Sequence, residues 1–122
     1  MRYFTHSQYF NPLMLGSFLL VFASMLITID QYGSPIPFYD EWEAEAAWLY
    51  KLHIEGNLGF GELFEPHNGH RVVLTRITAL FLFVLNGGWE PQLQLIVNSI
   101  LHASTAAILV LLVQNYVRFD FQ

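Results

Sequence analysis

The sequence predicts an all-α integral membrane protein with three transmembrane helices. Hydrophobic residues make up 54% of the 122 residues and charged residues only 12%, against about 25% charged residues in an average soluble domain. The hydrophobic residues are concentrated in three blocks, and seven of the ten acidic residues lie between the first two blocks, from Asp40 to Glu65. Long apolar blocks separated by polar segments are typical of helices that cross a bilayer.

The charge balance excludes several classes of partner. The net charge is −5 and only five residues are Lys or Arg, which argues against nucleic acid, since nucleic-acid binding requires a basic patch. No polybasic segment is available for anionic lipids, so contact with the lipid bilayer must come from spanning helices. The absence of cysteine excludes disulfides and thiolate metal sites.

The first transmembrane helix is predicted at residues 12–30. Residues 13–29 are nearly all apolar, and a spanning helix needs about 20 such residues. The alternative is a cleaved signal peptide, whose apolar region is about 7–15 residues long and precedes a small-residue cleavage site. Asp30 and Gln31 follow this block instead, so the sequence favours a membrane span.

An outer loop is predicted at residues 31–69, with an amphipathic helix over about residues 40–54. The Gly-Ser-Pro-Ile-Pro segment at 33–37 prevents the first helix from continuing. Asp40 can then cap a new helix, with Glu43 three residues later as in a capping box. Apolar residues recur at helical spacing after this cap, so we expect the helix to lie along the membrane surface.

The second and third transmembrane helices are predicted at residues 70–88 and 92–114. The continuous apolar part of the second covers only residues 72–85, which is short for a span. Extending it to a spanning length places Arg71 and Arg76 near one end, where they can snorkel or line a polar cavity. Polar residues along the third helix suit contacts between helices.

The basic residues indicate the orientation of these helices. Arg2 places the N-terminus in the cytoplasm and the acidic loop on the other side, although Arg118 would then also fall outside. We therefore expect a multi-pass protein of the cell membrane, of the bacterial inner-membrane type.

Two interpretations remain open for Asp40 and Glu41. They could be a helix cap and part of a solvated acidic face. Alternatively, one could be a general base that takes a proton from an acceptor hydroxyl as it attacks, its basicity raised because neighbouring aromatic residues exclude water. Adjacent residues of a helix point in different directions, so only one can face a site, and we favour Asp40.

Two interpretations also remain for the polar residues near the second predicted span. His67, His70 and Arg71 share one face if this segment is helical, and a helix N-terminus with an arginine attracts phosphate or diphosphate. Arg76 would lie about 7.5 Å further along the axis and could reach the same cavity. The alternative is that the arginines anchor the helix end at lipid headgroups and the histidines are ordinary interfacial residues.

A metal site is chemically possible but unsupported. Asp40, Glu41, His67 and His70 are residue types that bind divalent ions. No compact motif such as His-Glu-x-x-His joins them. We therefore assign no metal ligands and no firm cofactor, and neither a nucleophilic triad nor a phosphate-binding glycine loop is visible.

The order of these parts resembles the GT-C class of polytopic membrane glycosyltransferases. The resemblance is carried by Phe-Tyr-Asp-Glu-Trp at 38–42 and His-Asn-Gly-His-Arg at 67–71, which look like the first outer loop of bacterial members. These enzymes take a sugar from a polyprenyl-phosphate carrier, as in dolichyl-phosphate-mannose mannosyltransferases and lipid A arabinose transferases. The resemblance implies that Asp40 or Glu41 is the base and that Arg71 and His70 hold the carrier phosphate.

The predicted function follows from this resemblance. We expect the N-terminal part of a longer glycosyltransferase, because the family has many more spans, and we expect the chain alone to be inactive. The enzyme would move a sugar from a polyprenyl-phosphate-linked donor to an acceptor hydroxyl on the non-cytoplasmic side, with inversion. The alternative is a small non-catalytic multi-pass membrane protein that acts as an interaction or structural subunit.

Overall fold

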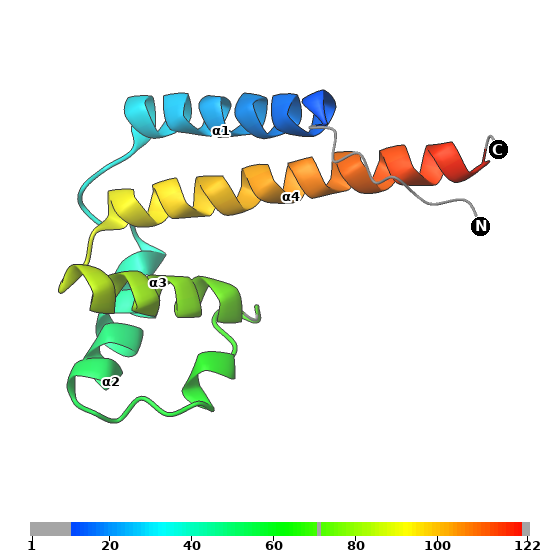
Figure 1. The fold of residues 1–122 in the computed structure, drawn as a ribbon. Helices are drawn as coiled ribbons and strands as arrows, with labels where there is room; N and C mark the ends of the chain where they lie inside the picture. Colours follow the sequence, from blue (N-terminus) through cyan, green and yellow to red (C-terminus); the bar gives the residue numbers. More distant parts are fainter. Residues whose placement is uncertain (1–10, 71, 121–122) are drawn as a thin grey trace. The chain divides into compact units, whose positions relative to one another are not determined.

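The computed structural model describes residues 11–70 and 72–120, with side chains up to residue 117. Its regular elements are helices, and the described chain is all-α, as predicted (Figure 1). The four α-helices are joined by a π-helix, η1, and a 3₁₀ helix, η2. In chain order the elements are α1 (Pro12–Tyr32), η1 (Trp42–Tyr50), α2 (Lys51–Ile54), η2 (Glu62–Phe64), α3 (Val73–Asn86) and α4 (Pro91–Asp120).

The chain forms two compact units, and each is described by itself. The helix-pair unit consists of Met1–Ile27 and Asn98–Gln122, and the loop unit consists of Thr28–Val97. The helix-pair unit therefore holds most of α1 and α4. The loop unit holds the three short helices, α3 and the first turns of α4.

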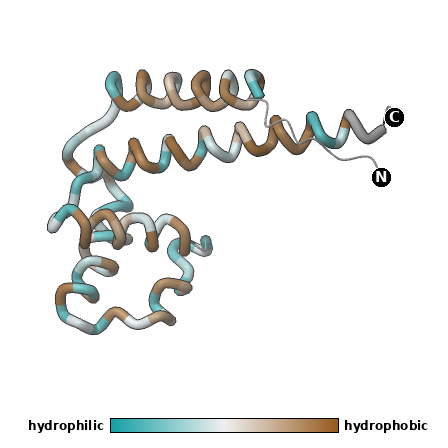
Figure 2. The backbone as a smooth tube through the Cα atoms, in the orientation of Figure 1, coloured by the Kyte–Doolittle hydropathy of each residue, from teal (hydrophilic) through white to brown (hydrophobic). Residues whose placement is uncertain are grey.

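Two of the described helices are long and apolar enough to cross a membrane. They are α1, with 21 residues, and the Pro91–Val117 part of α4, with 27 residues. The backbone of both is coloured mainly as hydrophobic (Figure 2). A rise of about 1.5 Å per residue makes each at least as long as the roughly 30 Å hydrocarbon core of a bilayer. The predicted helices at 12–30 and 92–114 coincide with these two.

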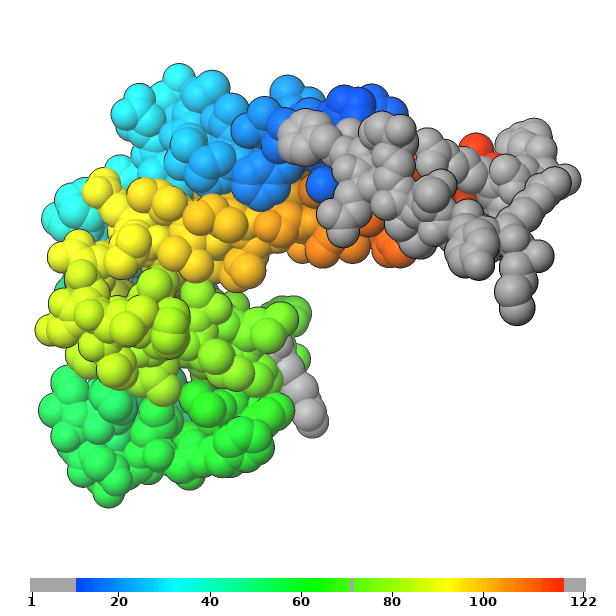
Figure 3. All heavy atoms as spheres, viewed as in Figure 1, coloured from blue at the N-terminus to red at the C-terminus, as the bar shows by residue number. Residues whose placement is uncertain are grey.

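The helix-pair unit packs α1 and α4 in antiparallel directions. Asn11 caps α1, because its Oδ1 accepts hydrogen bonds from the backbone N–H groups of Leu13 and Met14. Its Nδ2 also donates to Oε1 of Gln114, which fixes the start of α1 beside the end of α4. Side chains of the two helices meet in the space-filling view (Figure 3). A groove of about 530 Å³ lies between them, lined by Leu13, Leu20, Leu109 and Val113 among others.

Small residues form a buried stripe on α4. Ser99, Ala103 and Ala107 repeat every four residues on one face of α4, and all three are buried. Stripes of small side chains are common on the packed faces of membrane helices.

The second predicted span, at residues 70–88, is wrong in its extent. The structure gives α3 only 14 residues, Val73–Asn86, or about 21 Å of helix, which is shorter than the hydrocarbon core of a bilayer. Gly87 ends the helix in the left-handed conformation, with φ of 69°. At the other end, a tight turn at 67–70 replaces the first helical turns that the sequence predicted.

The predicted amphipathic helix at about 40–54 forms at that position, but much of it is a π-helix. Its wider turns bring Glu45, Leu49 and Tyr50 onto one buried face. Leu49 and Tyr50 form the core of the loop unit together with Ala79 of α3. Partly buried apolar residues surround this core: Trp48, Leu58, Leu63, Leu80, Phe83 and Trp89. Burying a leucine of this kind contributes about 1.5–3 kcal/mol.

The predicted capping box of Asp40 and Glu43 is wrong. No side-chain hydrogen bond caps η1, and Asp40 is exposed. Instead, Oε2 of Glu41 accepts a hydrogen bond of 2.8 Å from the backbone N–H of Phe38. The chain enters the helix through a tight turn in which Tyr39 has a φ of 39°, and this turn brings the carboxylate of Glu41, rather than that of Asp40, against the backbone of Phe38.

Candidate functional site

A buried carboxyl group lies at the centre of the loop unit. Glu45 is only 7% exposed, and both of its carboxyl oxygens are hydrogen-bonded. Oε1 accepts from Nε2 of Gln94 at 2.6 Å, and Oε2 accepts from Oη of Tyr50 at 3.1 Å. The first hydrogen bond joins η1 to the start of α4, 49 residues later. Glu45 therefore ties together segments that are far apart in the sequence.

Burial changes the proton affinity of this cluster. It raises the pKa of Glu45 above its ordinary value of 4.5, and the hydrogen bonds from Gln94 and Tyr50 offset only part of that shift. The negative charge of Glu41 also raises this pKa. Burial, together with the charge of Glu45, raises the pKa of Tyr50 well above its ordinary value, so Tyr50 remains a hydrogen-bond donor at neutral pH.

We expect the free energy of unfolding of the loop unit to depend on the ionisation of Glu45. A raised pKa in the folded state means that folding favours the protonated carboxyl group. The contribution of Glu45 to the free energy of unfolding is therefore greatest below its pKa in the unfolded chain, about 4.5. This contribution is lost as the pH rises through the pKa of Glu45 in the folded protein. The measurement is the unfolding free energy against pH for the wild type and Glu45→Gln. Parallel curves for the two proteins would contradict this expectation.

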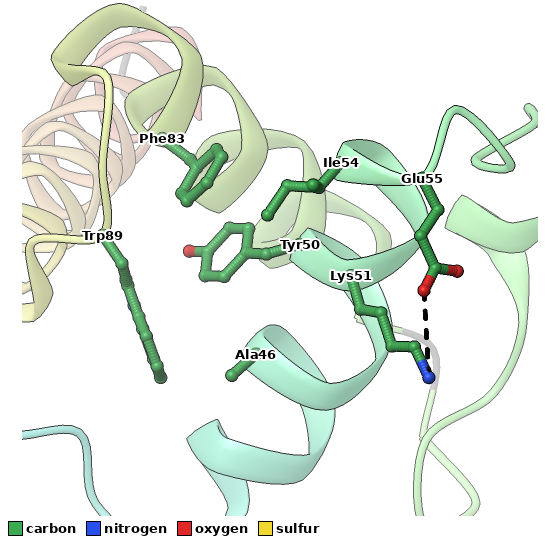
Figure 4. Close-up of a pocket in the computed structure, with 7 residues that line it drawn as sticks. All are labelled: Ala46, Tyr50, Lys51, Ile54, Glu55, Phe83 and Trp89. Carbon is green, nitrogen blue, oxygen red and sulfur yellow. Dashed lines mark ion pairs between the residues drawn. The ribbon is translucent and has the colours of Figure 1, made fainter.

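A pocket of about 330 Å³ opens beside this cluster (Figure 4). Its walls come from η1, α2, α3 and the turn before α4. Tyr50 stacks on Phe83, with ring centroids 4.3 Å apart, and meets Trp89 edge-on at 5.3 Å. The lining residues are Ala46, Tyr50, Lys51, Ile54, Glu55, Phe83 and Trp89.

The chemistry of this pocket is that of an apolar site with a polar rim. The ion pair of Lys51 and Glu55, at 4.0 Å, lies at its edge, and both side chains are largely exposed. The hydroxyl of Tyr50 donates to Glu45, so it is already engaged. The pocket can therefore hold an apolar or flat ring-shaped group, with Lys51 and Glu55 as the charged side chains at its rim.

Arg76 was predicted to bind a phosphate, and the structure shows it engaged inside the protein. Its side chain is only 4% exposed. Nη1 donates to the backbone carbonyl of Glu62 at 3.0 Å and also to those of Leu63 and Glu65. The guanidinium carbon lies 4.2 Å from the ring centroid of Trp48, a cation–π contact. Arg76 thus holds the η2 segment onto α3.

The other predicted site residues lie on two separate features. Asp40 and Glu41 begin the helix that continues as η1, and Glu41 accepts a hydrogen bond from the backbone N–H of Phe38, just before it. His67 and His70 face each other across a tight turn. Arg71 lies outside the described residues, and the phosphate-binding and catalytic roles stay predictions.

The four residues considered as metal ligands are not brought together. No group of three or more histidine, aspartate or glutamate residues in the described chain could hold a metal ion. Asp40 and Glu41 therefore do not complete a site with His67 and His70.

Sequence reasoning missed the Glu45 cluster. With ordinary helical spacing, Glu45 belongs to the solvated acidic face, whereas the π-helix turns it inward with Tyr50. Its other partner, Gln94, lies at the start of a predicted span, and nothing in the sequence pattern indicates its contact with Glu45. The only available hint was the five-residue spacing of Glu45 and Tyr50, which matches one turn of a π-helix.

Comparison with known proteins gives no relative for this chain. No protein-family model, no curated protein and no solved structure matches it.

Proposed function

We propose that this chain belongs to a membrane glycosyltransferase that takes a sugar from a polyprenyl-phosphate carrier. The observation that carries the proposal is one chain with two bilayer-length apolar helices and, between them in sequence, a folded acidic unit. That unit exposes the Asp40 carboxylate at the start of a helix. An exposed carboxylate is free to take a proton from an acceptor hydroxyl.

The roles in this proposal are distributed over the loop unit. Asp40 is the base, while Glu41 shapes the turn in which Asp40 lies through its hydrogen bond to Phe38. His67, His70 and Arg71 receive the carrier phosphate. Arg76 supports these residues indirectly, because it fixes the segment that precedes them. The reaction forms a bond between the acceptor oxygen and the sugar, and the carrier phosphate leaves.

A second function is favoured by the internal contacts of the polar residues. Glu41, Glu45 and Arg76 all make contacts within the loop unit. The pocket beside them is lined mainly by apolar side chains. These features suit a non-catalytic membrane protein whose loop unit is a structural or interaction module.

Replacing Asp40 by Asn in the full-length protein should abolish sugar transfer. The amide cannot accept the hydroxyl proton, and loss of a general base reduces the rate by about 10²–10⁴-fold. The assay is transfer from labelled polyprenyl-phosphate-linked hexoses and pentoses in reconstituted vesicles. Resistance to carbonate extraction checks that membrane insertion is unchanged.

Glu43→Gln is the matched control for this experiment. Glu43 is an exposed carboxylate on the same helix, and its replacement should leave transfer unchanged. Full activity of Asp40→Asn would remove Asp40 from the mechanism. Failure of the wild type to consume any of the donors would favour the structural or interaction role.

A further inference from the structure

The turn at residues 67–70 brings two histidines together. His67 and His70 form an isolated antiparallel bridge with two backbone hydrogen bonds, each 2.8 Å long. Asn68 and Gly69 connect them with φ angles of 48° and 79°. Positive φ at both central residues is the mark of a two-residue type I′ turn. The bridge is therefore a minimal β-hairpin with histidine at both flanking positions.

Directly opposite residues of such a hairpin place their side chains on the same face. Their Cα atoms lie about 5.5 Å apart when they exchange both hydrogen bonds. Two imidazoles that begin at this separation can close around one ion, since Zn²⁺–N distances are about 2.0–2.1 Å. His70 is exposed and His67 is partly exposed, so an ion can reach both rings.

The side chain of Asn68 contacts the ring of His67. Nδ2 of Asn68 lies 3.3 Å from Nε2 of His67. The neutral imidazole is the form of histidine that binds metal ions. No acidic residue joins the pair among the described residues. The two rings would thus supply half of a tetrahedral coordination shell.

We propose that His67 and His70 form a two-histidine site for a divalent transition-metal ion, with Zn²⁺ as the best match. Imidazole suits zinc, and two protein ligands leave two coordination positions for water or for oxygen atoms of an anionic ligand. The site is built by the turn rather than by a helix face. It does not depend on the proposed sugar transfer, because the geometry concerns only residues 67–70.

The test is a Zn²⁺ titration of the full chain in detergent, without a polyhistidine tag, followed by calorimetry. We expect one ion per chain, with His67→Ala and His70→Ala each weakening binding by at least about tenfold, because two linked ligands bind far more tightly than one. In a ¹⁵N-labelled protein, the ring nitrogens of these two histidines should shift on zinc addition.

Matched controls come from two other described histidines. His53 and His102 are exposed and lie on helices, so His53→Ala and His102→Ala should leave the affinity unchanged. Gly69→Ala keeps both ligands but places a side chain at a φ of 79°, which strains the turn, and it should weaken binding. Equal affinity of the wild type and His67→Ala, unshifted ring signals, or unchanged affinity of Gly69→Ala would overturn the site.

Discussion

Arg76→Ala is expected to destabilise the loop unit by about 3 kcal/mol, because the guanidinium makes hydrogen bonds to backbone carbonyls and stacks on an indole. The carbonyls of Glu62, Leu63 and Glu65 would lose the donor that holds the η2 segment against α3. Hydrogen exchange of the backbone amides in η2 and the first turns of α3 should therefore increase. Urea unfolding in detergent gives the change in free energy.

Lys51→Ala is the matched control for this prediction. Lys51 is also a cation of the loop unit, but its side chain is 63% exposed and its ion pair with Glu55 is a 4.0 Å contact. Such exposed pairs contribute about 0.5 kcal/mol or less. Arg76→Lys should lose most of the stability as well, since an ammonium group lacks the planar face that covers Trp48. Similar stability of the Arg76→Ala and Lys51→Ala proteins would show that Arg76 does not hold this unit together.

Glu45→Ala should have the second large effect, a loss of about 2 kcal/mol, because it leaves two buried donors without an acceptor. The hydroxyl of Tyr50 and the side-chain amide of Gln94 both point to this carboxyl group. Loss of the second contact also frees the start of α4 from η1. Hydrogen exchange at the first turns of α4 measures that release directly.

Glu45→Gln separates the loss of the hydrogen bonds from the loss of the charge. Glutamine keeps the shape and one acceptor, can donate to Tyr50, and removes a carboxylate that burial disfavours. We expect a stability at neutral pH equal to or above that of the wild type. Glu43→Ala, at an exposed position of the same helix, should leave the stability unchanged. A Glu45→Gln protein as unstable as Glu45→Ala would mean that the charge itself stabilises the unit.

The positions of the helices were largely predictable from local patterns. Pro12 and the long apolar block after it were enough to place α1, and Pro91 marks the start of α4. At the end of α3 the prediction extended to residue 88, whereas the helix ends at Asn86, before Gly87 and Gly88. These signals are local, because proline restricts the backbone and glycine frees it whatever the surrounding structure is. The length of an apolar run can likewise be counted directly in the sequence and compared with the thickness of a bilayer.

The roles of the polar residues were less predictable, because they depend on contacts between distant segments. Asp40 and Glu41 are adjacent in sequence, yet only the turn at Tyr39 decides that Glu41, and not Asp40, accepts the hydrogen bond from the backbone of Phe38. Helical spacing alone does not decide whether Arg76 faces a phosphate or a cluster of backbone carbonyls. Its buried position follows from how residues 62–65 return onto α3, which no local pattern encodes.

The sequence by itself determined an all-α chain, the two helices of bilayer length, and the acidic segment between them. Hydropathy and helix breakers act over a few neighbouring residues, so they can be inferred without a structure. Only the tertiary structure decided that Glu45 is buried with Tyr50 and Gln94, that α3 is too short to span a bilayer, and that His67 and His70 face each other across a turn. Burial and hydrogen-bond partners arise when segments far apart in the chain meet, and that meeting sets the protonation and the role of each polar side chain.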